Sequence, residues 1–387
     1  MSADSAIADV LLPLALDGAY SYRIPAGMGL GLGDFVAVPL GPRQMIGVVW
    51  ALKDQAMTNK ALRDVIGRFD VPPLSDTHRK FIDWLSAYYL EPAGNVLRMV
   101  LRAPGAFAGP REQVAYRITD SAPKRMTPQR ARVLEVAREG FAMRAVDLAE
   151  AAGVGTSVIK ALVKDGALQA VALPALRRFA EPVLNAGGYI LSADQQAAAA
   201  ALRAAVVARG HKVMLLDGVT GSGKTEVYFE AMAAALAGGA QVLLLLPEIA
   251  LTQPFLARVE NRFGCEAAQW HSDVRTRERD RVWRGVADGT ARIVVGARSA
   301  LFLPWKKLGL IVVDEEHEAA YKQEDGVSYH ARDMAVVRGR IENAPVVLAS
   351  ATPSLETRVN AERGRYAHLR LPERFGGREL PQLGLVD

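Results

Sequence analysis

Hydrophobic and polar residues alternate in three ways along the chain, and each way predicts a different kind of region. Up to residue 108, short apolar runs are separated by glycine and proline turns, and several runs alternate with a period of two. This period is typical of β-strands that bury one face. An amphipathic helix over 76–89 follows, and the Gly/Ala/Pro-rich stretch 103–110 favours a linker. We expect a small, mostly β domain over residues 1–108, with strands over 7–14, 20–24, 34–39 and 46–52.

A second region, residues 111–180, has the pattern of three short helices followed by extended chain. Thr127 and Pro128 form a typical helix start, and this helix is expected to stop at Gly140. Three helices and a hairpin are the winged-helix pattern. Such a module often binds nucleic acid through its third helix, and it also serves as a spacer in protein–protein contacts. The other predicted elements are helices over 145–152 and 156–164 and extended chain over 167–173.

In the third region, residues 185–375, apolar runs alternate with helical segments. This alternation predicts an α/β fold with a parallel sheet. Residues 376–387 are expected to begin a linker to domains outside this chain. The whole is therefore expected to be multidomain. The apolar runs that predict sheet strands are 213–216, 242–246, 292–295, 310–313 and 346–348.

The composition is that of a folded globular protein with several hydrophobic cores. Of the 387 residues, 50% are hydrophobic and 23% charged. No apolar run reaches the roughly 18 residues that a membrane helix needs, and residues 1–4 lack the positive start of a secretory signal. The single cysteine, Cys265, excludes an internal disulfide and a zinc site built of cysteines. We expect a cytoplasmic protein with no membrane partner.

The positive charge is unevenly distributed. Residues 1–180 contain 22 Lys and Arg against 17 Asp and Glu, whereas residues 181–387 contain 25 of each. The whole excess of +5 therefore lies in the first half. A mildly basic region is compatible with a nucleic-acid partner, and it is equally compatible with an ordinary solvated surface.

A phosphate-binding loop follows the first apolar run of the third region. The stretch fits the pattern G-x-x-x-x-G-K-[ST], and it lies between a predicted strand and a predicted helix. Backbone N–H groups of such a loop and the helix N-terminus surround a polyphosphate, the lysine reaches its β- and γ-phosphates, and the hydroxyl joins the Mg²⁺ shell. We expect a RecA-like P-loop NTPase lobe that binds ATP and Mg²⁺ through Gly218, Val219, Thr220, Gly221, Ser222, Gly223, Lys224 and Thr225.

Further polar residues stand directly after predicted strands. Asp314 and Glu315 follow the run 310–313, a position from which the first acid can hold Mg²⁺ and the second can polarise the attacking water. Ser350 and Thr352 follow the run 346–348, from where their hydroxyls can bond an acid on the neighbouring strand and link nucleotide state to the lobe. Catalytic roles are therefore predicted for Lys224, Asp314 and Glu315.

Gln195 lies upstream of the phosphate loop. Its amide has both a donor and an acceptor, so it can read both on adenine. The alternative is a surface glutamine that caps a helix. We include Gln195 among the predicted ATP contacts.

Asp-Glu-x-His followed by Ser-Ala-Thr resembles the superfamily-two helicases. Longer strings resemble, more narrowly, the PriA-type replication-restart helicases, the family of primosomal protein N′. The resemblance is close over residues 190–375 and looser towards the N-terminus. The strings are GVTGSGKTEVY at 218–228, PEIALT at 247–252, GARSALFLP at 296–304, YKQ and YHARD between 321 and 333, and SATPSLET at 350–357.

The resemblance implies an ATP-dependent DNA helicase of 3′→5′ polarity that recognises forked DNA at abandoned replication forks. It implies ATP and Mg²⁺ as cofactors, and forked and single-stranded DNA as partners. It also implies contacts with primosome and helicase-loading proteins and with single-stranded-DNA-binding protein, in a nucleoid-associated setting. Through the family motif, His317 joins Ser350 and Thr352 in coupling nucleotide to the rest of the protein.

The resemblance also implies DNA contacts in an aromatic-rich loop over residues 321–338. Stacking of bases on Tyr329, with charge from Lys322, His330 and Arg332, would suit single strands. The alternative is that both tyrosines of the loop pack inside the lobe. The loop lacks a tryptophan that some members carry, so coupling is expected to be softer. The residues predicted to contact DNA here are Tyr321, Lys322, Tyr329, His330, Arg332 and Arg298.

The first hundred residues resemble the family's small domain that captures the 3′ end of a nascent strand. Tyr20, Ser21 and Tyr22 fall where many members have an aromatic-Asp-aromatic triplet. Ser21 replaces the acid that would accept the 3′-hydroxyl, and it is expected to form a hydrogen bond without charge assistance. Gly41 and Arg63 are predicted to complete the pocket.

The family pattern continues beyond these residues, with a second motor lobe and a cysteine-rich insert that binds zinc. Zinc is therefore expected only there. An arginine from a second lobe contributes about 10³–10⁵ in rate in related systems, so we expect this chain to bind ATP weakly, bind forked DNA and turn over little. One hypothesis is the N-terminal part of a motor enzyme, favoured by intact Lys224, Asp314 and Glu315. Others are a self-standing DNA-structure-binding adaptor with nucleotide only as a ligand, and a P-loop protein acting on another polymer.

Overall fold

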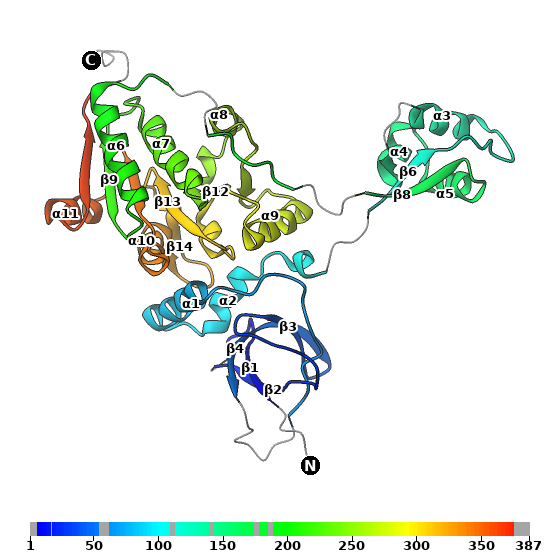
Figure 1. Cartoon of the computed structure of the whole chain (residues 1–387), viewed down its shortest axis with the longest axis horizontal. Helices are drawn as coiled ribbons and strands as arrows, with labels where there is room; N and C mark the ends of the chain where they lie inside the picture. The colour runs from blue at the N-terminus through cyan, green and yellow to red at the C-terminus, as the bar shows by residue number, and fades with distance from the viewer. Residues whose placement is uncertain are drawn as a thin grey trace, which may run out of the picture. The chain divides into compact units, whose positions relative to one another are not determined.

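A computed structural model describes most of the chain, in two compact units (Figure 1). The first unit comprises residues 1–107 together with 178–387, and the second comprises 108–177. Each unit is described by itself. The described residues are 6–16, 18–53, 62–108, 113–138, 142–173, 178–184 and 189–374.

The N-terminal region of the first unit, described from residue 6 to residue 107, is a five-stranded antiparallel sheet followed by helices. The strand order is β2-β1-β4-β3-β5. Strands β3 and β4 form a hairpin whose two-residue turn begins at Gly41, with φ of 59°, a value that glycine adopts without strain. The strands are β1 Ile7–Leu11, β2 Tyr20–Arg23, β3 Phe35–Leu40, β4 Arg43–Lys53 and β5 Gly67–Arg68, and the helices are α1 Asp76–Tyr89, α2 Ala93–Val100 and the 3₁₀ helix η1 Pro104–Phe107.

The rest of the first unit, residues 189–374, is an α/β lobe around a parallel sheet of seven strands. The strand order is β11-β12-β10-β13-β16-β9-β17. The five predicted strands are present. Two short edge strands, β11 and β17, mix polar with apolar residues and were therefore missed. The strands are β9 Val213–Gly218, β10 Gln241–Leu245, β11 Ala268–Trp270, β12 Ile293–Gly296, β13 Leu308–Asp314, β16 Val346–Ser350 and β17 Ala367–Leu371.

Helices cover both faces of this sheet, as the near-continuous apolar strands require. Helices α6, α7 and α8 pack on one face and α9 and α10 on the other, so alternate side chains of each strand enter two separate cores. The helices are α6 Ala193–Val207, α7 Lys224–Ala237, α8 Gln253–Phe263, α9 Thr276–Asp288, α10 Ala331–Glu342 and α11 Leu355–Glu362. Shorter elements are η2 Glu248–Ala250, η3 Arg298–Phe302, η4 Ala319–Tyr321 and the hairpin β14 Lys322–Gln323 with β15 Tyr329–His330.

The N-terminal region and the lobe share one hydrophobic core. Phe107 packs against Trp283 of α9, whose indole N–H donates to the Val100 carbonyl at 2.8 Å. Ala103, Ala106 and Phe107 are buried. The prediction of a linker over 103–110 is therefore wrong for its first half, because these residues join the core; residues 109 and 110 lie outside the described part.

A buried cation reinforces this joint. Arg338 of α10 is fully buried, donates to His78 Nδ1 at 3.1 Å and to Glu342 Oε1 at 3.0 Å, and lies over the Phe81 ring of α1. Burial, and secondarily the charge of Arg338, hold the pKa of His78 well below its usual value. A neutral imidazole can accept the hydrogen bond from Arg338, so α1 and α10 are held together without a second buried positive charge.

The second unit has three helices and a three-stranded antiparallel sheet in the order β7-β6-β8. The Thr127 hydroxyl caps the first helix by accepting from the Arg130 N–H, as predicted. Within the described residues no hairpin follows the third helix, and residues 174–177 lie outside them. Instead, β8 pairs with β6, which precedes the helices. The elements are β6 Gln113–Ile118, α3 Pro128–Ala137, β7 Met143–Arg144, α4 Ala145–Ala151, α5 Thr156–Lys164 and β8 Leu168–Leu173.

Candidate functional site

The phosphate loop connects β9 to α7. Gly221 and Gly223 have φ of 81° and 82°, values that residues with a side chain rarely adopt. A Cβ at Gly223 would collide with the Gln195 side-chain amide. Lys224 opens α7, is buried, and donates from Nζ to the Gly218 carbonyl at 2.9 Å. The loop thus curls around a buried ammonium group that retains two N–H donors for another partner.

Asp314 stands at the end of β13, beside this loop. Its Oδ2 accepts from the Tyr228 hydroxyl of α7 at 2.9 Å, and its Oδ1 accepts from the Glu315 N–H at 3.1 Å. Burial raises the pKa of the Asp314 carboxyl to about 6, although the hydrogen bond from Tyr228 and the charge of Lys224 oppose the rise. A carboxyl desolvated in this way readily accepts a cation.

Glu315 and His317 turn away from the strand towards Ser350. Glu315 adopts φ of 47°, and its side chain is 40% exposed. His317 Nδ1 lies 2.8 Å from the Ser350 hydroxyl and 3.7 Å from Glu315 Oε2. The Thr352 N–H donates to Ser350 Oγ at 3.0 Å. Because β13 and β16 are adjacent, the residues predicted to couple nucleotide to the lobe lie together.

Gln195 caps a helix, as one of the two alternatives has it, and also contacts the phosphate loop, while its contact with adenine stays a prediction. Its Oε1 accepts from the Ser192 N–H at 2.9 Å and so caps α6, while its Nε2 donates to the Ser222 carbonyl of the phosphate loop at 2.8 Å. The residue is buried, so it is not a surface glutamine. One amide hydrogen and one acceptor lone pair remain by count.

These residues enclose a cavity of about 410 Å³, within the roughly 300–1,000 Å³ usual for small-molecule sites. The cavity contains the predicted residues from Thr220 to Thr225 together with Gln195, Asp314 and Glu315; Gly218 and Val219 do not line it. Its wall also includes Tyr189, Leu191, Glu226 and Arg258.

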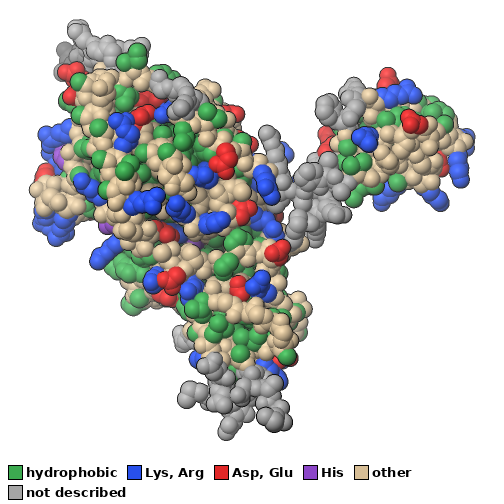
Figure 2. Space-filling model, in the orientation of Figure 1, with side chains coloured by type: hydrophobic (Ala, Val, Ile, Leu, Met, Phe, Trp, Pro, Cys, Tyr) green, Lys and Arg blue, Asp and Glu red, His purple; other side chains and the backbone are tan. Residues whose placement is uncertain are grey.

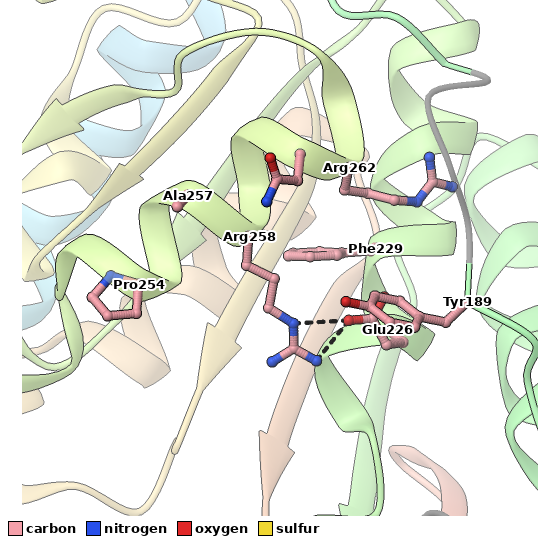
Figure 3. A pocket seen from close by; sticks show the side chains of 8 residues that line it. Tyr189, Glu226, Phe229, Pro254, Ala257, Arg258 and Arg262 are labelled. Atoms are coloured by element: carbon pink, nitrogen blue, oxygen red, sulfur yellow. Dashed lines mark hydrogen bonds and ion pairs between the residues drawn. The ribbon is translucent and has the colours of Figure 1, made fainter.

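A second cavity, of about 360 Å³, adjoins the first and shares Tyr189, Glu226 and Arg258 with it (Figure 3). Arg258 of α8 reaches Glu226 of α7 with two contacts, 2.8 Å from Nε and 2.6 Å from Nη2. Sequence reasoning missed this pair. The available signal was that Glu226 directly follows the loop threonine; nothing in the sequence placed Arg258 beside it.

Glu316 is the most deeply buried residue of the acidic stretch, and it was also missed. Its carboxylate accepts from the Ser354 N–H at 2.7 Å, the Ser354 hydroxyl at 3.0 Å, the Thr357 hydroxyl at 2.8 Å and Arg332 Nη1 at 3.3 Å. This cluster ties the end of β13 to α10 and α11. The available signal was Ser354 and Thr357 in the string at 350–357. Only Ser350 and Thr352 of that string were assigned a role from the sequence.

Arg332 must be corrected as a predicted DNA contact. It is 7% exposed and also bonds Asp333 Oδ1 at 2.9 Å and the Ser354 hydroxyl at 2.6 Å. With its guanidinium bound to carboxylates and a hydroxyl inside the lobe, it is not presented to a nucleic acid in this structure.

The tyrosines of the aromatic-rich loop are buried, each 1% exposed. Tyr321 donates to the Leu245 carbonyl at 3.0 Å and the Asp314 carbonyl at 2.6 Å, and Tyr329 packs edge-on against Phe302. Neither ring can stack on a base in this structure, so the alternative of packing inside the lobe is the one realised. Tyr321 instead holds the backbone next to Asp314.

The remaining loop residues are more accessible. Lys322 is exposed and pairs with Glu324 at 2.6 Å. Arg298 donates to the Ala320 carbonyl at 3.1 Å and the Lys322 carbonyl at 2.6 Å, so it supports the β14–β15 hairpin. His330 is half-buried, and burial lowers its pKa. Cationic groups therefore remain at the surface around this hairpin.

The predicted N-terminal pocket divides into two groups. Arg63 Nη1 donates to the Gly41 carbonyl at 2.8 Å, and the Tyr22 hydroxyl donates to the Pro39 carbonyl at 3.1 Å; burial raises the pKa of Tyr22 while the charge of Arg63 lowers it. Tyr20 is 40% exposed. The Ser21 hydroxyl instead donates to Asp9 on β1 at 2.6 Å. Ser21 therefore has a carboxylate partner on the neighbouring strand, which the sequence did not indicate.

The described residues provide neither a metal-binding cluster nor a membrane-spanning helix. They contain no group of three or more His, Cys, Asp or Glu side chains that could hold a metal ion. In the same residues, no helix is both long enough and apolar enough to cross a membrane.

Comparisons with known proteins match both parts of the first unit. Residues 9–102 match the family model of the PriA 3′ DNA-binding domain, and residues 192–360 match that of the DEAD/DEAH box helicases. Replication restart protein PriA of Rickettsia felis is 34% identical, over 98% of this chain and 48% of its own length. The Haemophilus influenzae protein is 33% identical, over 96% of this chain and 52% of its own length. The Bacillus subtilis protein is 39% identical, over 64% of this chain and 31% of its own length. The chain spans about half the length of most of these relatives.

Proposed function

Because the chain belongs to the PriA family of replication restart proteins, we propose that it acts in an ATP-dependent DNA helicase of replication restart. In this proposal the lobe over residues 185–375 binds ATP, residues 1–108 bind a DNA 3′ end, and residues 111–180 contact DNA as a winged helix. The observation that carries the proposal is the 410 Å³ cavity, which is lined by Lys224 from the start of α7 and by Asp314 from the end of β13.

The donors present in the cavity fit a polyphosphate. The loop offers backbone N–H groups at the start of a 14-residue helix, and Lys224 has two free N–H donors. Gln195 and Tyr189 line the same cavity and the adjoining one contains Phe229, which suits a nucleobase. We assign the phosphates to residues 218–225 and the base to the side of Gln195.

The same edge fits Mg²⁺. The carboxyl of Asp314, with its raised pKa, and the hydroxyl of Thr225 are oxygen ligands of the kind that Mg²⁺ prefers, and both line the cavity. Glu315 is accessible beside them and would accept a proton from the attacking water. Its neighbour His317 contacts Ser350, and Thr352 contacts the same hydroxyl, so a change at Glu315 can reach the loop after β16.

DNA contact is proposed for both units. Lys and Arg side chains occur over the visible surfaces of each (Figure 2). Residues 108–177 contain 11 Lys and Arg against 7 Asp and Glu, so most of the chain's positive excess lies in the second unit. In the lobe, Lys322, His330 and Arg298 would contact single-stranded DNA by charge and hydrogen bonds rather than through the buried rings. Forked DNA, 3′→5′ translocation and contacts with helicase-loading and single-stranded-DNA-binding proteins complete the proposal.

Nucleotide titration of the purified chain tests the proposal. Wild type should bind a fluorescent ATP analogue with Mg²⁺, and Lys224→Ala should weaken binding about 100-fold, because a charge-assisted contact to phosphate is lost. Lys212→Ala, at an exposed lysine just before β9, is the matched control and should bind like wild type. Equal affinity of wild type and Lys224→Ala would refute the assignment of the cavity to nucleotide phosphates.

A further inference from the structure

The Ser21–Asp9 contact is a side-chain hydrogen bond between two neighbouring strands. Ser21 Oγ lies 2.6 Å from Asp9 Oδ1, and the two residues are directly opposite each other in the β1–β2 pair. This length is typical of a hydrogen bond from a hydroxyl to an ionised carboxylate. Such a bond is shorter and stronger than a hydrogen bond between neutral groups. The carboxylate that the family triplet lacks in this chain is thus supplied by the adjacent strand.

Positively charged groups stand on the same face of the sheet. Lys53 Nζ of β4 lies 2.6 Å from the other oxygen of Asp9. Ser21 and Arg23 are two residues apart on β2, and Ala51 and Lys53 are two apart on β4 opposite β1, so their side chains share one face. The Lys53 charge offsets that of Asp9, and a nearby phosphodiester is therefore not repelled.

The hydrogen bond fixes what Ser21 can offer a ligand. A serine hydroxyl has one donor and two acceptor lone pairs. The donor is used by Asp9, so the outward side of the oxygen can only accept. Donation to a carboxylate also polarises the hydroxyl and makes its oxygen a better acceptor. A partner that bonds this oxygen must carry a proton of its own.

A DNA strand presents such a proton in one place. The 3′ oxygen of an internal nucleotide is esterified and cannot donate, whereas the 3′-hydroxyl of a strand end can. Ser21 is partly exposed, so its oxygen can be reached from solvent. An acceptor-only oxygen here would therefore distinguish a strand end from a strand interior.

We propose that Asp9 is a specificity-determining residue that, by holding the proton of Ser21, makes Ser21 Oγ the acceptor for a free DNA 3′-hydroxyl. The inference rests on the proposed binding of 3′ ends by the N-terminal region. Asp9 replaces, from β1, the acid that stands in β2 in many family members.

The role of Asp9 is tested by measuring affinity for forked DNAs whose 3′ termini differ by one oxygen atom. The intact chain is titrated with forks whose nascent strand ends in a 3′-hydroxyl or in a 3′-deoxy terminus, which is neutral and has no proton to donate. Wild type should prefer the hydroxyl about tenfold, the upper ratio expected for one neutral hydrogen bond. In Asp9→Asn the preference should fall below about twofold, and in Ser21→Ala it should disappear.

Two further variants keep the test independent of folding. Asp70→Asn changes an exposed carboxylate of the same region and should leave the tenfold preference intact. Adding Ser21→Asp to Asp9→Asn returns an acid to β2 and should restore the preference. Thermal unfolding of each variant verifies that the region is folded.

The outcomes separate the two levels of the proposal. A wild-type preference that Asp9→Asn leaves unchanged would overturn the role of Asp9 while keeping 3′-end binding. A wild type that binds both forks equally well would overturn 3′-end binding by hydroxyl recognition, and the role of Asp9 with it. Loss of the preference in Asp9→Asn with recovery in the double variant is the result we expect.

Discussion

The phosphate loop takes its shape from eight consecutive residues, whereas the Ser21–Asp9 pair joins two strands across 12 positions of sequence. In the loop, backbone geometry at Gly221 and Gly223 and one lysine suffice, so a local pattern specifies the site. In the N-terminal region, the partner of Ser21 depends on the register of β1 against β2. A site built from backbone can be recognised from a motif, while a site built across strands requires the register.

The acids at the end of β13 are consecutive in sequence, but Glu316 among them bonds residues distant in sequence. Substitution of Glu316 tests these long-range contacts. Glu316→Ala should lower the free energy of unfolding by about 3–5 kcal/mol, because it leaves the buried guanidinium of Arg332 without its fully buried carboxylate partner. Chemical denaturation measures the change. Glu324→Ala, at an exposed acid that pairs only at the surface, should be nearly neutral. Equal effects of the two would show that the cluster around Glu316 does not stabilise the lobe.

Asp314 sharpens the comparison through pH, because burial of its ionised carboxyl lowers the stability of the fold. Its pKa of about 6 in the fold exceeds the usual value of 3.8 for an aspartate, so the folded state binds more protons and stability falls as pH rises towards 6. Asp314→Asn should therefore stabilise the nucleotide-free chain by about 3 kcal/mol at pH 7.5 and by about 1 kcal/mol at pH 4.5.

Thermal and denaturant unfolding at the two pH values test this prediction. Glu318→Gln, a nearby change outside the cavity, is the control and should show no pH-dependent gain. A stabilisation of Asp314→Asn that is the same at both pH values would indicate altered packing rather than removal of a desolvated charge.

His78 tests the joint between the two regions. Its pKa in the fold lies well below the usual histidine value of 6.5. Below pH 6.5 the unfolded chain therefore takes up a proton that the folded chain does not. Stability should fall on acidification from pH 6.5 by up to about 1.4 kcal/mol per pH unit. His78→Asn keeps an acceptor for Arg338 and should lose this contribution to the slope. His271→Asn should retain the wild-type slope, and identical slopes in all three proteins would contradict the buried neutral imidazole.

Tyr321 and Tyr329 give the smallest effects and a matched pair. Tyr321→Phe removes a hydroxyl that donates to the Leu245 and Asp314 carbonyls and should cost about 1 kcal/mol. The Tyr329 hydroxyl has no hydrogen-bond partner among the described residues, so Tyr329→Phe should change stability by less than about 0.5 kcal/mol. The free energies of unfolding provide the comparison. The reverse ranking would mean that Tyr329, rather than Tyr321, holds the lobe next to the acids at the end of β13.

Several features of the site were predictable because they are local. The phosphate loop, the acids after β13 and the hydroxyls after β16 each follow an apolar run, and the ends of neighbouring parallel strands meet at one edge. The start of the first helix in the second unit followed from its cap, Thr127, whereas the predicted stop at Gly140 lies outside the described residues and the helix ends at Ala137. What the pattern could not give were short mixed edge strands such as β11, the return of β8 to β6, and the core shared by Phe107 and Trp283.

The sequence by itself determined the kind of chemistry that the lobe can hold, because glycine positions, a lysine and strand-terminal acids act through backbone geometry close to their own positions. Only the tertiary structure decided which polar groups are used internally and which remain for a ligand. Burial assigned Arg332 and the tyrosines of the aromatic-rich loop to the lobe interior, and strand register gave Ser21 the carboxylate of Asp9. The physical reason is that desolvation and hydrogen-bond pairing depend on neighbours distant in sequence, whereas a phosphate loop depends on its own dihedral angles.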